Sequence, residues 1–453
     1  MNSITSDFEN SKIGKLLFKL ALPCILAQLV NVLYNIVDRI FIGKLPSGEI
    51  AMAGVGISFP IILIISAFSA LIGMGGAPIA AIKMGEKKNK EAEKILSNSF
   101  SMLIIIGLIL TIVFLIFKDP ILYTFGASDQ TIGYAQDYIT IYLIGTVFVQ
   151  IALGMNAFLN TQGFTKISMF TVMIGATINI VLDPILIFTF NMGVQGAALA
   201  TIIAQMFSAL FVLKFLFGKK TILRIHKEFL MPNLKIIIPI VSLGVSPFIM
   251  QSTESLVLIS LNTKLQAYSG DLAVGAMTIM ASIMQIIFLP LIGLAQGAQP
   301  IISYNYGAKN LDRVKATIKL LITCCLTYSL VMTSILMLFP ENIVSIFNST
   351  PEFINITVWS IRIYFIGTFI FGAQIACQRC FLALGQAKIS LLLALLRKMI
   401  LLIPLIFILP NFFEDKLFAV LLAEPVADIT AVIITSISFF IFYKRNLDNK
   451  SKV

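Results

Sequence analysis

Charged residues are scarce in this chain of 453 residues, in which Asp, Glu, Lys and Arg together make up 12%. A typical soluble domain has about 25% charged residues. Conversely, 58% of the residues are apolar and the mean hydropathy is +0.96. A soluble enzyme of two or three domains is excluded, because too few charges are available to solvate its surface. The net charge of +11 does not indicate a nucleic-acid partner, because no dense basic patch lies on a polar domain. The apolar residues must therefore face lipid.

Residues and motifs for catalysis are also nearly absent. A single histidine, His226, excludes a His-rich metal site and a Ser-His-Asp triad. Cys377 and Cys380, two of five cysteines, form a C-x-x-C motif. That motif lies in an apolar segment without a βαβ pattern, which disfavours a redox role. No G-x-x-x-x-G-K-[ST] motif is present, which disfavours direct use of ATP. We therefore expect no enzymatic activity.

Long apolar runs are what the sequence has in abundance. Crossing the hydrocarbon core takes about 20 helical residues, and twelve runs between polar breaks satisfy this. Their limits are 16–43, 51–82, 95–117, 134–160, 166–190, 194–217, 237–263, 272–303, 316–339, 353–384, 388–411 and 416–443. The first run is too long for a signal peptide and is expected to stay in the membrane. The sequence thus predicts an all-α membrane protein with twelve transmembrane helices. Candidate bends are the internal prolines Pro23, Pro184, Pro247, Pro290 and Pro404.

The basic residues predict the orientation of these helices. Lys and Arg concentrate in cytoplasmic loops. With twelve spans, 27 of the 33 basic residues fall on the side that holds both termini. The six on the other side are Arg39, Lys44, Lys118, Lys264, Arg362 and Lys416. We therefore expect both termini to be cytoplasmic, and the positive net charge reports topology.

The chain contains an internal repeat. A shift of 222 residues aligns Gly75, Pro78 and Gly85 with Gly297, Pro300 and Gly307, and Gly163–Ser168 with Gly385–Ser390. A shift of 224 pairs Pro23 with Pro247 in the first helix of each half. The sequence predicts two six-helix bundles in a parallel repeat, 1–217 and 237–453, joined by a cytoplasmic linker, 218–236. Two such bundles are typical of an alternating-access carrier, although duplication for stability alone is an alternative.

Several segments carry a resemblance to a known family. LALPCILAQLVNVLYNIVDRIFIGKL, GGAPIAAIKMGEKK with its echo GAQPIISYNYGAKN, and NIVLDPILIF resemble the multidrug and toxic compound extrusion (MATE) family, which belongs to the multidrug/oligosaccharidyl-lipid/polysaccharide flippase superfamily. The similarity covers essentially the whole chain. It implies antiport: efflux of mostly cationic, amphipathic drugs, driven by Na⁺ or H⁺ gradients, with no other cofactor. We expect a monomer in the lipid bilayer of a bacterial cell membrane.

Polar residues that occur in only one half are the best candidates for function. Asn179 and Asp183 are one helical turn apart and correspond to Leu401 and Leu405, while Asp38 corresponds to Asn262 and Thr201 to Ala423. At ~1.5 Å per residue, Asp38, Asp183 and Thr201 lie about 8–10 Å inside the outer ends of their helices. An uncompensated carboxylate in a membrane costs at least ~2.5–3.5 kcal/mol.

We therefore expect this cluster to bind the coupling ion. Its members are Asp38, Asn179, Asp183 and Thr201, which match the family's ion-binding positions and would ligate Na⁺ if the transporter is Na⁺-coupled. Tyr34, Tyr138 and Asn156 are expected to line the same cavity. The alternative is that Asp38 pairs with Arg39 or with another base.

The second half has acids of its own: Glu254 in the seventh run, and Glu424 and Asp428 in the twelfth. Either they attract a cationic substrate, or Arg397 and Lys398 neutralise Glu424 and Asp428 as buried pairs. A ligand role is favoured for Glu254, because no basic residue lies within its own helix turn. Further candidates for the cavity wall are Gln251, Met280 and Met284. The acid that one Na⁺-coupled branch of the family has in the tenth helix is missing, since the region reads FIFGAQIACQRC.

Two functions compete at this point. A secondary exporter of organic cations is favoured, because the intramembrane charge is mainly acidic. A flippase for a lipid-linked saccharide precursor shares the two-bundle plan, but it would be expected to carry a strongly cationic central cavity. A channel or a membrane-embedded enzyme lacks any supporting motif.

Overall fold

The computed structural model describes residues 2–46, 48–345 and 351–448, with side chains assigned except in 2–5, 271 and 272. Within these ranges the chain is helical and contains no strand. Ten helices are long and apolar enough to cross a membrane, and two bent helix pairs bring the number to twelve. The predicted all-α fold with twelve spans is confirmed, and the protein is a multi-pass membrane protein.

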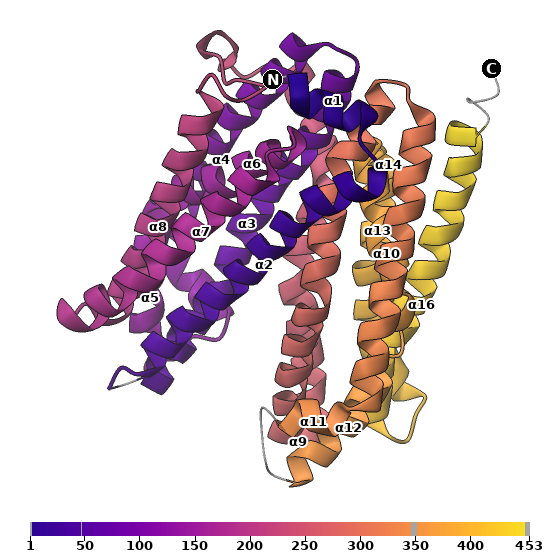
Figure 1. Cartoon of the computed structure of the whole chain (residues 1–453). Coiled ribbons are helices and arrows are strands. Elements are labelled where there is room, and N and C mark those ends of the chain that lie inside the picture. Colours follow the sequence, from indigo (N-terminus) through magenta and orange to yellow (C-terminus); the bar gives the residue numbers. More distant parts are fainter. Residues whose placement is uncertain (1, 47, 346–350, 449–453) are drawn as a thin grey trace.

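The first bundle occupies the N-terminal half of the chain (Figure 1, indigo to magenta). Its elements are α1 (Asn2–Asn10), α2 (Ile13–Gly43), α3 (Gly48–Gly85), α4 (Asn89–Thr124), α5 (Ile132–Ile144), α6 (Thr146–Thr161), α7 (Thr165–Pro184), the π-helix η1 (Ile185–Thr189) and α8 (Gly193–Leu216). A linker containing the short 3₁₀ helix η2 (Lys227–Phe229) follows.

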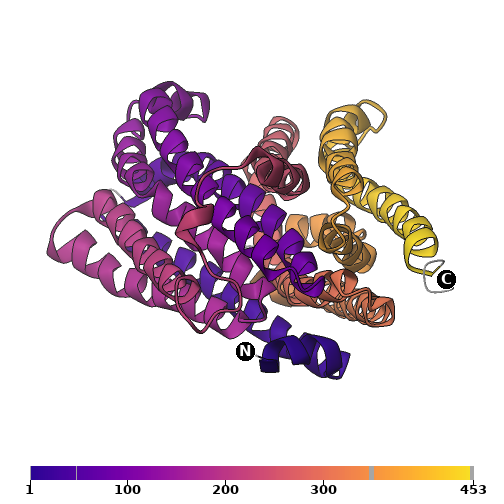
Figure 2. The same ribbon diagram turned by 90° about the horizontal axis from the view of Figure 1, so that it is seen from above.

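The second bundle begins with α9 (Leu234–Gly307), which comprises two spans that meet at Gly270, whose φ is 68°. Figure 2 shows the two bundles on opposite sides of the molecule when it is seen from the end that carries α1. The remaining elements are α10 (Leu311–Leu338), α11 (Pro340–Ser345), α12 (Pro351–Tyr364), α13 (Thr368–Ala383), α14 (Ala387–Leu395), the π-helix η3 (Leu396–Leu402), α15 (Ile403–Ile408), η4 (Leu409–Asn411), α16 (Lys416–Tyr443) and η5 (Lys444–Asp448).

Sharp bends between helices occur at equivalent positions of the two bundles. The α5–α6 pair bends by 60° and the α12–α13 pair by 50°. The breaks contain Gly145 and Gly367, which correspond at a shift of 222. A Cβ at Gly145 would collide with Ile202, and one at Gly367 would lie 2.8 Å from Asp428 Cβ. Close packing against the last span of each bundle therefore requires glycine at both breaks. Of the predicted prolines, Pro184 and Pro404 border the π-helices η1 and η3.

The bundles touch at the end that carries α1 and diverge toward the other end (Figure 1). The contact uses the duplicated glycine blocks. A Cβ at Gly85 would collide with the carbonyl oxygen of Tyr304, and one at Gly307 with that of Ile82. Because these two pairs are related by the repeat, α3 and α9 cross symmetrically. The glycines thus allow the two helix backbones to approach closely.

Helix α1 reinforces this end by docking onto the second bundle. Phe8 is fully buried and stacks on Tyr304 at 5.2 Å. The Tyr304 hydroxyl donates to Glu9 at 2.9 Å, and Arg313 Nε donates to the Phe8 carbonyl at 3.0 Å. Lys19 pairs with Asp7 at 2.7 Å and lowers the pKa of that carboxyl below its usual value. α1 therefore links α2 of the first bundle to α9 and α10 of the second.

Candidate functional site

The first bundle brings three of the predicted polar residues into direct contact. Asn179 and Asp183 project from the same face of α7, because they are one helical turn apart. Asn179 Nδ2 donates to Asp183 Oδ1 at 3.2 Å and to Thr201 Oγ1 of α8 at 3.3 Å. All three side chains are buried. The amide of Asn179 therefore connects the carboxylate on α7 to the hydroxyl on α8.

Asp38 joins this group from the last turns of α2, with 8% of its surface exposed. It lies close enough to Asp183, Tyr34 and Tyr138 to interact with them electrostatically. Among the described residues, no base lies within ion-pair distance of Asp38. The guanidinium of Arg39 lies 5.5 Å from the centre of the Phe59 ring instead. The alternative ion pair between Asp38 and Arg39 is therefore not formed.

A small cavity of about 40 Å³ adjoins these residues in the first bundle. Of the predicted residues, Tyr34, Asn156, Asn179 and Thr201 line it. Tyr138 lies beside Thr201 and stacks on Tyr142 at 6.3 Å. Further polar side chains of the cavity wall were missed by the sequence analysis, among them Asn31 and Gln205. Helical spacing could have found them, because Gln205 is one turn beyond Thr201 and Asn31 two turns before Asp38.

Several oxygen atoms of this group are buried without a hydrogen-bond donor. They are Asp38 Oδ1, Asn156 Oδ1, Asn179 Oδ1 and Asp183 Oδ2. Unpaired buried acceptors are rare in folded proteins, and carboxylate, amide and hydroxyl oxygens are the ligands that hard cations prefer. The described residues contain no group of three or more His, Cys, Asp or Glu side chains that could hold a metal. The arrangement therefore suits a proton, or a monovalent cation that the Asn and Thr oxygens help to bind.

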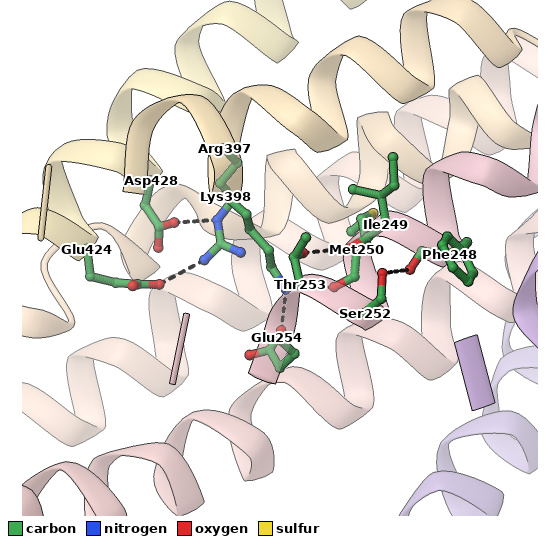
Figure 3. Close-up of polar contacts among 10 residues, drawn as sticks. All are labelled: Phe248, Ile249, Met250, Ser252, Thr253, Glu254, Arg397, Lys398, Glu424 and Asp428. Atoms are coloured by element: carbon green, nitrogen blue, oxygen red, sulfur yellow. Dashed lines mark hydrogen bonds and ion pairs between the residues drawn. The ribbon is translucent and has the colours of Figure 1, made fainter. Parts of the chain in front are cut away.

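The second bundle holds a contrasting cluster in which acids are paired with bases (Figure 3). Arg397 Nε donates to Asp428 Oδ1 at 2.6 Å, and a terminal guanidinium nitrogen donates to Glu424 Oε1 at 2.9 Å. The same guanidinium lies 4.4 Å from the centre of the Phe371 ring. Both acids are buried. Arg397 thus pairs with both acids of α16, as the ion-pair interpretation of the sequence anticipated for Arg397.

The pairing of Lys398 differs from that interpretation. Lys398 Nζ contacts Glu254 of α9 and donates to the Met250 carbonyl at 2.8 Å. The Lys398 side chain is buried, whereas 65% of the Glu254 side chain is exposed. The absence of a base within its own helix turn, which favoured a ligand role for Glu254, does not exclude a base from another helix. That argument considered only the helix that carries Glu254, whereas η3 supplies the lysine from far along the chain.

The other predicted wall residues of the second bundle have mixed positions. Met280 is fully buried in the apolar core of this bundle, and Met284 packs against that core. The helix face that carries Met280 points into the bundle, where its side chain packs among apolar residues. Gln251 is half-buried, and its Oε1 has no hydrogen-bond donor.

The repeat relates the two polar clusters. Helices α7 and α14 begin at equivalent positions, Thr165 and Ala387. At the shift of 222 residues, Arg397 and Lys398 correspond to Gly175 and Ala176. Both of these small residues line the cavity of the first bundle. The second bundle therefore has two cationic side chains at the positions where the first bundle has small residues that line its cavity.

Comparison with known proteins places both halves of the chain in one family. A sequence model of the MatE family matches residues 23–185 and again residues 246–408. The two matches start at a separation between the 222- and 224-residue shifts found in the sequence. The repeat and the resemblance to the MATE family are both confirmed.

Similar proteins align over nearly the full chain. The multidrug export protein MepA of Staphylococcus haemolyticus is 28% identical over 94% of this chain and 94% of its own. A ligand-bound structure of the MATE multidrug transporter DinF-BH is 34% identical, covers 96% of this chain and 97% of its own, and has a TM-score of 0.89. A MATE structure in the bent conformation has a TM-score of 0.93 at 22% identity, with 100% and 99% of the two chains covered.

Proposed function

Because the chain belongs to the MatE family, we propose that it is a multidrug efflux transporter, which exports cationic amphipathic compounds in exchange for Na⁺ or H⁺. Its relatives of similar length include a multidrug export protein and a multidrug transporter. Since relatives are found in Staphylococcus, we infer that it acts in a bacterial cell membrane. The positive-inside rule supports a cytoplasmic location for both termini.

The observation that carries the coupling mechanism is the unpaired acid group of the first bundle. Asp38 and Asp183 have no basic partner within ion-pair distance among the described residues, and each has a buried oxygen without a donor. Two buried carboxylates that repel each other are stabilised when a cation or a proton binds. The coupling ion would bind from the outside and be released inside. This cycle would return the empty transporter to the conformation that binds the next substrate.

Alternating access is supported by the way the two bundles meet. The glycine-mediated crossing of α3 and α9 and the docking of α1 close the end that carries α1, while the bundles diverge at the other end (Figure 1). Export requires this crossing to separate and the opposite end to close, and rocking of two similar bundles achieves this. If the α1 end is cytoplasmic, the structure corresponds to a conformation open to the outside.

The charge of the two clusters favours cations as substrates. Five acids, Asp38, Asp183, Glu254, Glu424 and Asp428, are accompanied by two bases, Arg397 and Lys398. A net negative site attracts organic cations and repels pyrophosphate. The flippase alternative needs a cationic cavity, and this balance of charges does not favour it.

The test is transport of ethidium in proteoliposomes that contain the full chain, with Na⁺ and pH gradients imposed separately. We expect one of the two gradients to drive uptake. Asp38→Asn should reduce driven transport at least about tenfold, because the amide binds neither a proton nor Na⁺ as tightly as the carboxylate does. Asp129→Asn is the matched control, because Asp129 is exposed in the loop between α4 and α5. Uptake that ignores both gradients, or unimpaired transport by Asp38→Asn, would contradict the proposal.

A further inference from the structure

We propose that Lys398 is a tethered cation that competes with the cationic substrate for Glu254, so that substrate binding and the Lys398–Glu254 ion pair exclude each other. This inference rests on the proposed export of organic cations. It assigns a specificity-determining role to a lysine of the second bundle.

The two partners of this ion pair are unequally exposed. Lys398 is 7% exposed at its side chain and Glu254 is 65% exposed. Glu254 lies in the middle of the first span of α9, Leu234–Gly270. An exposed carboxylate at that depth would be costly against lipid, so we place it toward the water-accessible space where the bundles diverge. A solute that enters this space meets the carboxylate before it meets the lysine.

Lys398 is held less firmly than its neighbour Arg397. Arg397 is fixed by two acids (Figure 3) and by the Phe371 ring. Lys398 has one acid and one carbonyl, that of Met250. A lysine ammonium on a flexible stem makes point contacts that are more easily exchanged than the bidentate contacts of a guanidinium. Of the two bases, Lys398 is therefore the one that a competing cation can displace.

When Lys398 leaves Glu254, a second acid, Glu424, is available as its partner. Glu424 lies within the electrostatic range of Lys398. Its Oε1 accepts from Arg397, but its Oε2 is buried without a donor. Lys398 can therefore pass from Glu254 to the unpaired oxygen of Glu424 without leaving its ammonium buried and unpaired. Two alternative partners make a side chain that a ligand can switch.

The repeat provides independent support. The position of Lys398 is that of Ala176 in the first bundle, where the side chain borders an open cavity. A bundle of the same architecture thus leaves a small space beside this position, and the second bundle has an ammonium group there. Such an internal cation lowers the affinity for an external one and expels it when the ion pair re-forms.

The experiment measures ethidium binding to the purified full-length protein by fluorescence anisotropy. Lys398→Met removes the charge and keeps a side chain of similar length. We expect its Kd to fall about fivefold, the factor equivalent to a partly exposed ion pair of about 1 kcal/mol. Ethidium efflux should slow at the same time, because release loses its internal competitor. Nile red, a neutral dye, should bind both proteins equally.

Glu254→Gln keeps the proposal testable if Lys398→Met does not fold, because Glu254 is largely exposed and contributes little to the core. We expect it to weaken ethidium binding about fivefold and to leave Nile red unaffected, and the double variant should behave as Glu254→Gln does. Unchanged or weaker ethidium binding by a folded Lys398→Met, or unchanged binding by Glu254→Gln, would overturn the inference. If the wild type transports ethidium, those results leave the proposed function standing; if it neither binds nor transports, the proposed function itself fails.

Discussion

The two bundles share a backbone plan but fill their centres in opposite ways. In the first, Asn179 borders a cavity, and the acids Asp38 and Asp183 have unpaired oxygens. In the second, the corresponding helix carries Leu401 and Leu405 at those positions and two bases one turn earlier. One bundle thus has negative charge and space, while the other has nearly balanced charge. The two centres therefore differ in charge although the helices that carry them correspond in the repeat.

The largest effect, a loss of stability, is expected when the ion pairs of Arg397 with Glu424 and Asp428 are broken. Arg397→Met leaves Glu424 and Asp428 buried without their base, which typically costs about 3–5 kcal/mol. We expect a strongly reduced thermal unfolding midpoint and low yield of folded protein. Adding Glu424→Gln and Asp428→Asn should restore most of the stability, because no unpaired charge is left. If Arg397→Met alone unfolds at the wild-type temperature, the cluster does not depend on charge pairing.

The second effect comes from making the first bundle resemble the second. Ala176→Lys places an ammonium in the cavity wall near Asn179, where it can pair with the coupling acids. We expect ion-driven transport of ethidium to fall at least about tenfold, because a permanent internal cation replaces the coupling ion. Ala176→Met is the matched control of similar length without charge. If both variants lose transport equally, the loss is due to the volume of the new side chain. The difference in charge between the two bundles would then not explain it.

The smallest effect is expected at a feature that both bundles share, the glycine at the bend between two helices. Gly145→Ala and Gly367→Ala each introduce a Cβ into a close helix contact. Overpacking of this kind usually costs about 1–3 kcal/mol, so both variants should unfold a few degrees below the wild type. The midpoints of the two variants, measured side by side, should be similar. A loss confined to one of them would show that the breaks are not equivalent.

Much of the fold could be predicted because lipid imposes strong rules on sequence. A helix must satisfy its own backbone and present apolar side chains, so the twelve runs coincide with helices in the structure. The duplicated Gly75 and Gly85 predicted a repeat, and the structure gives their use at the crossing of α3 and α9. The bends at Gly145 and Gly367 were not predicted. A bend at a glycine depends on what packs against it, which the sequence does not give.

The candidate site was predicted in part. Asn179, Asp183 and Thr201 could be grouped because their spacing and depth are properties of single helices. The partner of Glu254 could not be found in this way, because Lys398 comes from another helix and helix spacing gives no lateral contacts.

The sequence by itself determined that this protein is helical, membrane-spanning, duplicated and asymmetric in its acids. Those properties follow from composition and from periodic patterns along one chain. Only the tertiary structure decided which acids are paired. Asp38 and Asp183 keep unpaired oxygens because Arg39 lies over Phe59, while Arg397 and Lys398 each point to acids on other helices. An ion pair depends on distances of a few ångströms between helices, and helix packing alone sets those distances.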